Sequence, residues 1–223
     1  MRQGSPVRLE LANARVVADR VVLAVNYEAD RLGVLKSRLV GSTLAGSFTR
    51  ALAADELDSL GSLREWGAIS LHGGGATLRL TRDGRISIRN TAEYHGSKLL
   101  SDAELERRQQ VHRAAFDKRF PQLRHVPFEY AWSGVEGITR NGTNFFGRRC
   151  DRVFYAGGYN GSGVSRGTAF GTAIADYASG ETSQTVSDCL ASAPAPRIPP
   201  RPLLDVAAWF QVRSRFRAVG LDR

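Results

Sequence analysis

The feature that most constrains the fold of this chain is a glycine-rich segment that joins an apolar run to a helix. Residues 157–171 read Gly-Gly-Tyr-Asn-Gly-Ser-Gly-Val-Ser-Arg-Gly-Thr-Ala-Phe-Gly and come directly after the apolar run Val153–Ala156. Glycines at a strand end let the backbone approach a ligand, and the helix after them presents free amides and the positive end of its dipole. We expect a strand, a loop and a helix over about 163–178. The loop either faces a bound group or serves only as a turn.

A nicotinamide-binding dinucleotide fold is excluded by the sequence after this helix. That fold needs a second strand that ends in an acidic residue for the ribose. The sequence instead passes through Gly180 and polar residues into a stretch where five of the eight prolines lie between Pro194 and Pro202. We therefore expect the loop to approach a cofactor whose nucleotide end is held elsewhere. The prolines indicate an extended connection.

The first thirty residues predict strands whose apolar faces are not covered by any other element in this part of the chain. Residues 7–12 alternate between apolar and polar side chains, and Val16-Val17 continue them as a hairpin through Asn13. Val21–Val25 is a continuous apolar run, as in strands buried on both faces. Little else in this part of the chain could cover those faces, which indicates that a segment of the fold is missing.

The middle of the chain predicts an antiparallel sheet. Residues 66–71, 76–81 and 85–90 have the composition of three strands of a meander. Asp83-Gly84 supplies the positive φ angles of a tight hairpin turn between the last two. A further long strand is expected over residues 126–139.

Two helices are expected outside the glycine-rich segment. Ser101 and Glu104 form a capping box that starts a helix running to about Phe120, in which His112 is more typical of a packed residue than of a catalyst. A last amphipathic helix runs from Leu203 to about Arg217. Its arginines are compatible with a membrane surface, but we expect Trp209 and Phe216 to pack onto the body of the protein.

The composition of the chain limits the classes of molecule that it is expected to bind. The 223 residues are 42% hydrophobic, enough for a real core, and carry a formal net charge of +9. Only three of the 31 basic residues are lysine, and the arginines are spread along the chain without a basic block or interleaved aromatics. Solvated arginines explain this charge better than nucleic-acid binding does. The dispersed arginines therefore lead us to expect no nucleic-acid partner. No apolar run is long enough to span a bilayer, so we expect no membrane partner.

Cysteine and histidine usage points away from disulfides and metals. The two cysteines cannot form a disulfide framework, and the four scattered histidines lack the short spacings of metal ligands. The N-terminus has no apolar leader of the secretory type. We expect a cytoplasmic protein without a metal site.

Three segments resemble the D-amino-acid oxidase-like (DAO) family of FAD-dependent oxidoreductases, which includes glycine, sarcosine and gamma-glutamylputrescine oxidases. Residues 18–26 are similar to the family's "A-D-x-V-V-L-A-T-N" strand. Residues 132–142 resemble its "W-x-G" and "T-x-D/N-G" stretch, and residues 157–171 its "G-Y-N-G-x-G-V-x-x-G-T-x-x-G" loop. The segments occur in the family's order across nearly the whole chain. Phe145 departs from the pattern, because proline is common there.

The resemblance implies an α+β chain, α/β in the complete family. It would comprise an antiparallel or mixed substrate-domain sheet with flanking helices, plus the C-terminal remnant of a Rossmann-like FAD-binding domain. Residues 1–35 would be a remnant of the FAD domain, and residues 36–140 the substrate-domain sheet and helix. Residues 141–182 would form the flavin-facing strand, loop and helix, and residues 183–223 a proline-rich connection and C-terminal helix. The family's N-terminal G-x-G-x-x-G loop is absent from this sequence.

The resemblance also implies a chemistry and a set of binding residues. The complete protein would oxidise a C–N bond of an amine or amino acid by hydride transfer to flavin, with no residue assigned as catalytic. Arg140, Arg79 and Tyr94 are the candidates for substrate binding, the two arginines because a guanidinium grips a carboxylate with two donors. For both arginines, an exposed surface charge is an equally good interpretation. The cofactor-binding candidates are Gly157, Gly158, Tyr159, Asn160, Gly161, Ser162, Gly163 and Val164.

The resemblance implies that this part of the protein holds FAD without a covalent bond. No cysteine that could attach the flavin lies at residues 130–133, and Cys150 lies too far along the chain. The partners would be a small amine or amino-acid substrate and a missing N-terminal FAD-binding segment. We expect the isolated chain to bind FAD poorly and to be inactive. Two alternatives stay open: a truncated, inactive relative, or a basic binding module on the same scaffold.

Overall fold

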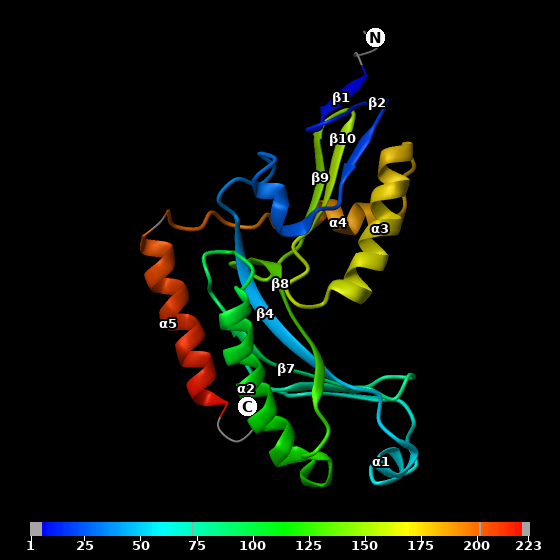
Figure 1. The fold of residues 1–223 in the computed structure, drawn as a ribbon. Coiled ribbons are helices and arrows are strands. Elements are labelled where there is room, and N and C mark those ends of the chain that lie inside the picture. Colours follow the sequence, from blue (N-terminus) through cyan, green and yellow to red (C-terminus); the bar gives the residue numbers. More distant parts are fainter. Residues whose placement is uncertain (1–5, 73, 201, 220–223) are drawn as a thin grey trace. The chain divides into compact units, whose positions relative to one another are not determined.

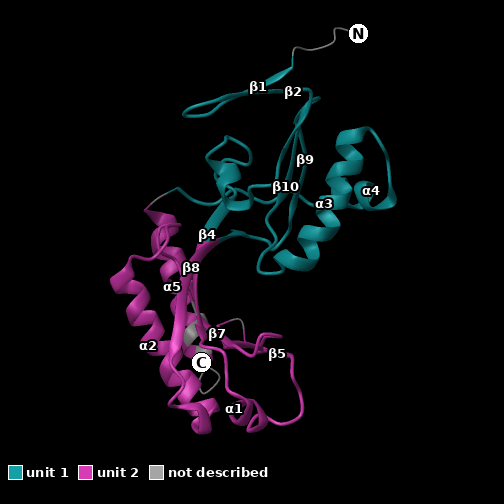
Figure 2. Ribbon diagram, turned by 45° about the vertical axis from the view of Figure 1, so that its right-hand side comes forward, with its two compact units in different colours: residues 1–41, 136–200 teal, residues 42–135, 201–223 magenta. Residues whose placement is uncertain are grey.

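The computed structural model describes residues 6–72, 74–200 and 202–219 (Figure 1). The chain divides into two compact units, coloured separately in Figure 2. The loop unit comprises residues 1–41 and 136–200, and the sheet unit comprises residues 42–135 and 201–223. The division falls inside two long strands, β4 (Leu39–Thr49) and β8 (Phe128–Thr139).

The loop unit contains a two-stranded hairpin and a three-stranded sheet. The hairpin pairs β1 (Val7–Glu10) with β2 (Arg15–Ala18). The sheet has the order β3 (Val21–Leu23), β10 (Val153–Gly157), β9 (Phe145–Cys150). Strand β10 runs parallel to β3 and antiparallel to β9. The helical elements of this unit are η1 (Asn26–Asp30), α3 (Gly163–Ser179) and α4 (Gln184–Ala191).

The sheet unit is built on five strands in the order β5 (Trp66–Ile69), β6 (Thr77–Leu80), β7 (Ile86–Glu93), β4, β8. The β5-β6, β6-β7 and β7-β4 pairs are antiparallel. Its helical elements are α1 (Ala54–Asp58), α2 (Asp102–Arg119), η2 (Pro121–Leu123) and α5 (Leu203–Ala218).

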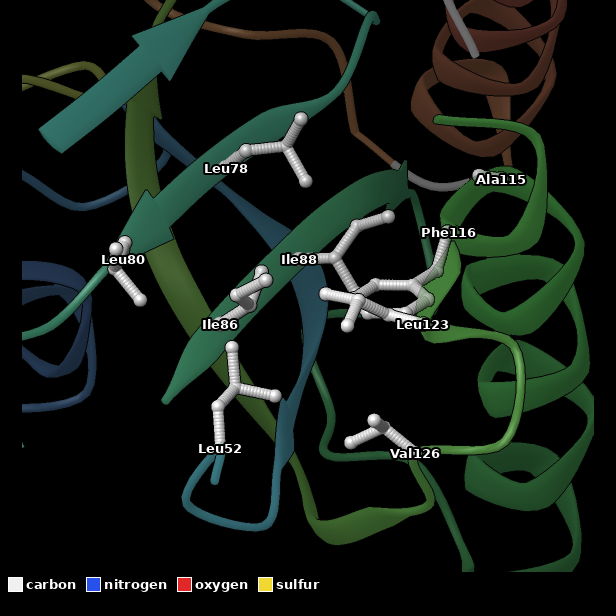
Figure 3. Packing of buried hydrophobic residues seen from close by; sticks show 9 residues of the cluster. All are labelled: Leu52, Leu78, Leu80, Ile86, Ile88, Ala115, Phe116, Leu123 and Val126. Carbon is white, nitrogen blue, oxygen red and sulfur yellow. The ribbon is translucent and has the colours of Figure 1, made fainter. Parts of the chain in front are cut away.

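The main core of the sheet unit lies between α2 and one face of the sheet (Figure 3). Phe116 of α2 is fully buried in the same core as Ile86 and Ile88, which lie two residues apart on β7 and so share one face. Leu123 and Val126 close the end of this core after Pro121 has ended the helix. The alternation of β7 and the buried face of α2 therefore fix how helix and sheet meet.

The structure confirms the expected fold class and most of the expected elements. The meander is β5-β6-β7, and its hairpin turns at Gly84, which has a φ of +76°. Helix α2 begins after Ser101, whose backbone N–H donates to the carboxylate of Glu104 at 2.9 Å. The long strand is β8, and the helix after the glycines is α3.

Two expectations were wrong in whole or in part. The apolar run Val21–Val25 is a strand only as far as Leu23. Its exposed side chains agree with the expectation of a missing cover: Val22 and Val25 are 43% and 42% exposed, and β3 is flanked by β10 alone among the described residues. Trp209 is 53% exposed rather than packed onto the body, and the side chain of Phe216 lies outside the described part. Within the described ranges, no helix is both long and apolar enough to cross a bilayer.

Candidate functional site

The candidate site is the glycine loop, residues 157–162, together with the first turn of α3. Gly161, Ser162, Gly163 and Val164 are all exposed, Val164 at 91%. The helical hydrogen bonding starts with Arg166, whose N–H donates to the carbonyl of Ser162 at 3.1 Å. The amides of residues 163–165 therefore precede the first helical bond and lie at the positive end of the helix dipole. Such a cluster of open donors suits an electron-rich group.

Asn160 fixes the shape of the loop. It adopts a left-handed φ of +52°, which asparagine tolerates better than most residues. Its side-chain oxygen accepts from the backbone N–H of Thr139 at 2.8 Å, and its amide nitrogen donates to the carbonyl of Thr143 at 3.3 Å and to that of Gly158. The Asn160 amide thus ties the loop to the end of β8.

Asn26 holds the loop from the other side. It comes soon after β3, and its side-chain oxygen accepts from the N–H of Gly158 at 2.9 Å. A Cβ at Gly137 would lie 2.9 Å from the same oxygen, so only glycine fits there without a shift. This role of Asn26, and the supporting roles of Thr139 and Thr143, were not predicted from the sequence. An asparagine just after an apolar strand, where left-handed turns are common, was the available signal.

The first two glycines of the loop are buried against Phe145. A Cβ at Gly157 would lie 2.3 Å from the ring of Phe145, and one at Gly158 would lie 2.8 Å from it. Gly158 also has a φ of +72°. Phe145, which stands where the family often has proline, fills the space that these two glycines leave. Both glycines are therefore required by packing, whatever their backbones contribute to a cofactor.

Tyr159 and Gly163 differ in their surroundings. The ring of Tyr159 meets that of Phe170 on α3 edge to face at 6.0 Å, and burial raises the pKa of its phenol. Gly163 adopts no left-handed φ, and no described atom lies within 4 Å of a Cβ placed there. Gly163 already belongs to the first turn of α3, whereas Gly158, Asn160 and Gly161 of the loop before it adopt positive φ angles. A requirement for glycine at residue 163 would therefore have to come from a group that occupies the open space beside it.

Of the three substrate-binding candidates, Arg140 belongs to the loop unit, and Arg79 and Tyr94 belong to the sheet unit. Arg140 is exposed in the turn after β8. Arg79 on β6 pairs with Glu65 at 3.1 Å and lies across from Ser87. Tyr94 lies just after β7, seven residues beyond Ser87, so roughly 20 Å of strand separates it from Arg79. The Tyr94 hydroxyl donates to Asp205 of α5 at 2.6 Å.

The donor set of the loop fits the edge of a flavin ring. The exposed amides and the open space at Gly163 leave room for a flat group, and a carboxylate oxygen of Glu136 would lie 3.8 Å from a Cβ at Gly161. Among the described residues, no cluster of three or more His, Cys, Asp or Glu side chains could hold a metal.

Known proteins share both sequence and fold with this chain. It is 32% identical over 104 residues to gamma-glutamylputrescine oxidoreductase of Escherichia coli, a stretch covering 44% of this chain and 24% of that protein. Glycine oxidase of Geobacillus kaustophilus has the same fold, with a TM-score of 0.66 at 18% identity; the match covers 81% of this chain and 47% of the glycine oxidase chain. L-Proline dehydrogenase of P. horikoshii matches with a TM-score of 0.60 at 20% identity, over 80% of this chain and 47% of the dehydrogenase chain.

This chain thus spans about half of those solved chains and about a quarter of the E. coli relative. The pattern of the DAO family, described as FAD dependent oxidoreductase, matches residues 2–177. Because that match takes in the strand before Asn26, the end of β8, the glycine loop and most of α3, the chain belongs to the DAO family of FAD dependent oxidoreductases.

Proposed function

We propose that this chain forms the substrate-side and flavin-edge part of an enzyme that oxidises a C–N bond of an amine or amino acid. The observation that carries the proposal is the open amide cluster at the start of α3, fixed by Asn160 and Asn26. FAD, when bound, would accept a hydride from the carbon beside the nitrogen. The names of the relatives, which include glycine oxidase and L-proline dehydrogenase, point to amines and amino acids as substrates.

In this proposal the protein positions the cofactor and stabilises charge. The amides of Gly161, Gly163 and Val164 would hold the electron-rich edge of the ring, and the α3 dipole would add about 0.3–1 kcal/mol when exposed. Gly157 and Gly158 would keep the strand end close to the ring while packing on Phe145. Attachment through this chain would be non-covalent, since Cys150 lies exposed at the end of β9 rather than in the loop.

Each part of the chain would have its own task in such an enzyme. Residues 1–35 and 141–182 would belong to a FAD domain, residues 36–140 to a substrate domain, and residues 183–223 would form the connection and last helix. Because the sequence contains no G-x-G-x-x-G loop, the nucleotide end of FAD would be bound by a further segment, in the same chain or as a separate partner.

Two variants of Gly163 test the role of the loop in a complete protein. Gly163→Val should abolish flavin reduction by substrate, because the branched side chain would occupy the open space beside the amides. Gly163→Ala, with a smaller side chain at the same position, should keep most of the activity. The measurement is anaerobic bleaching of the flavin absorbance, with circular dichroism as the check on folding. Wild-type bleaching in the valine variant would mean that the loop is only a turn.

Arg140 is the proposed grip for a substrate carboxylate. Arg140→Met in the complete protein should raise the KM for carboxylate-bearing substrates by about one to two decades, since a charge-assisted bond contributes roughly 1.5–3 kcal/mol. Simple amines should be much less affected. Arg79→Met is the matched comparison, because Arg79 is engaged by Glu65. An equal effect of Arg140→Met on both substrate types would remove Arg140 from the site.

The two alternatives have less support. An inactive relative would show no flavin absorbance even when the nucleotide-binding segment is supplied. A basic binding module would use free arginines, yet many are in ion pairs with carboxylates, among them Arg50 with Glu56, Arg108 with Glu93 and Arg113 with Asp117. A steep fall of nucleic-acid binding with salt would favour that alternative.

A further inference from the structure

The outer face of α5 is apolar although it is not buried. We define this face by four side chains that are 65%, 55%, 53% and 62% exposed: Leu203, Val206, Trp209 and Phe210. Their spacing of three and four residues places them on one side of the helix. Isolated exposed apolar residues are ordinary, but several on one helix face form a patch that needs an explanation.

The opposite face already has its contacts within the sheet unit. Helix α5 lies against β7, and Asp205 in its first turn accepts the hydroxyl of Tyr94 at 2.6 Å. Leu204 and Ala208 on this inner face are partly buried. The helix is therefore attached to the sheet unit by one side, and the α5 outer face is a second apolar surface.

Basic groups continue the same face toward the C-terminus. Arg213 and Arg217 are exposed and lie one and two turns beyond Trp209. The guanidinium carbon of Arg213 is 5.1 Å from the centre of the Trp209 ring, and that ring meets Phe210 edge to face at 5.0 Å. Asp205 is the only acidic residue in the sequence of α5, and it is engaged on the inner face.

We propose that the α5 outer face binds an anionic lipid surface, with the helix lying in the interface rather than crossing it. Trp, Phe and Leu would enter the boundary between headgroups and acyl chains, while the two arginines reach the lipid phosphates. A second copy of the chain is a poorer occupant, because a symmetric contact of this face would cover Arg213 and Arg217 of both copies with a face of α5 that offers them no carboxylate. This inference does not depend on the proposed reaction.

Flotation of lipid vesicles tests the proposal on the whole chain, since bound protein rises with the lipid while aggregated protein sinks. The wild type should float with phosphatidylcholine vesicles that contain phosphatidylglycerol, and less with phosphatidylcholine alone. Arg213→Gln with Arg217→Gln should lower binding to the anionic vesicles by about fivefold per arginine. Trp209→Gln with Phe210→Gln should lower binding to both kinds of vesicle.

Matched control variants distinguish an effect of the α5 outer face from a general effect of lost positive charge or lost exposed apolar side chains. Arg20→Gln with Arg82→Gln removes the same charge from exposed positions off the helix, and Leu63→Ser with Leu71→Ser removes two exposed leucines. Both pairs should bind like the wild type. Failure of the wild type to float, or equal losses in the control pairs, would overturn the proposal. So would a stable dimer that Trp209→Gln with Phe210→Gln dissociates, because the face would then belong to a second copy.

Discussion

Gly157 and Gly163 lie six residues apart in one glycine-rich segment, but their surroundings impose different demands. We predict that Gly157→Ala destabilises the chain by about 1–3 kcal/mol, because its Cβ would meet the Phe145 ring at 2.3 Å and the core would be overpacked. Gly163→Ala should change the free energy of unfolding by less than about 0.5 kcal/mol, since its Cβ enters open space. Urea unfolding followed by circular dichroism measures both. Equal losses would mean that Phe145 does not fill this space.

The sequence identified the glycine loop but not the side chains that hold it. The loop is recognisable because six glycines within fifteen residues have few structural uses. Its anchors are remote: Asn26 is 132 positions from Gly158, and Thr139 is 21 from Asn160. No local pattern encodes such pairings, which arise only when β3 pairs with β10 and β8 ends beside the loop.

At the scale of elements, the junction of α2 and β4 makes stability depend on pH. His112 of α2 is fully buried and lies 2.8 Å from the hydroxyl of Ser47 on β4. Burial, with a smaller effect of the nearby Arg108 charge, lowers the pKa of His112 from 6.5 to about 4. Because the folded state resists protonation, the stability from neutral His112 is full above pH 6.5. It declines as the pH falls toward 4, below which it is lost.

The corresponding prediction compares His112→Gln with the wild type. Between pH 7 and pH 4 the wild type should lose about 3 kcal/mol more unfolding free energy than the variant, which has no imidazole to protonate. The measurement is urea unfolding at several pH values. His72→Gln, which removes an exposed histidine, should behave like the wild type. A His112→Gln profile parallel to the wild type would show that the buried imidazole is protonated without cost.

Elements with strong local signals were predictable, and those without them were not. The hairpin at Asp83-Gly84 and the capping box at Ser101 each combine a turn or cap residue with apolar periodicity. Strand β4 was missed because its sequence, Leu-Val-Gly-Ser-Thr-Leu-Ala-Gly-Ser-Phe-Thr, contains two glycines and many small polar residues. It is nevertheless buried along most of its length, between β7 and β8. Helix α4 was missed because half of its eight residues are polar, and only Val186 and Cys189 are buried.

At the scale of the whole molecule, this chain would supply only one end of the proposed flavin site. The loop unit supplies the strand end, the glycine loop and the first turn of α3. The pyrophosphate of a dinucleotide cofactor usually lies over a helix that comes after the first strand of its fold, and the ribose meets an acidic residue after the second. The described sheet of the loop unit holds only β3, β10 and β9, and the helix after β10 leads to α4 rather than to a second such strand.

We therefore predict that the 223-residue chain alone purifies colourless and inactive. The few amides of the glycine loop would have to offset the cost of ordering a large flexible ligand, and the contacts for its nucleotide end are missing from this sequence. Val22 on β3 and Val25 just after it are about 40% exposed, and the outer edge of β3 has no strand partner in the described residues, which should also favour association in solution. Adding a G-x-G-x-x-G segment from a relative, fused or as a separate partner, should restore flavin absorbance and reduce association measured by light scattering. A monomeric chain that purifies with stoichiometric FAD would contradict this division of the site and require a different one.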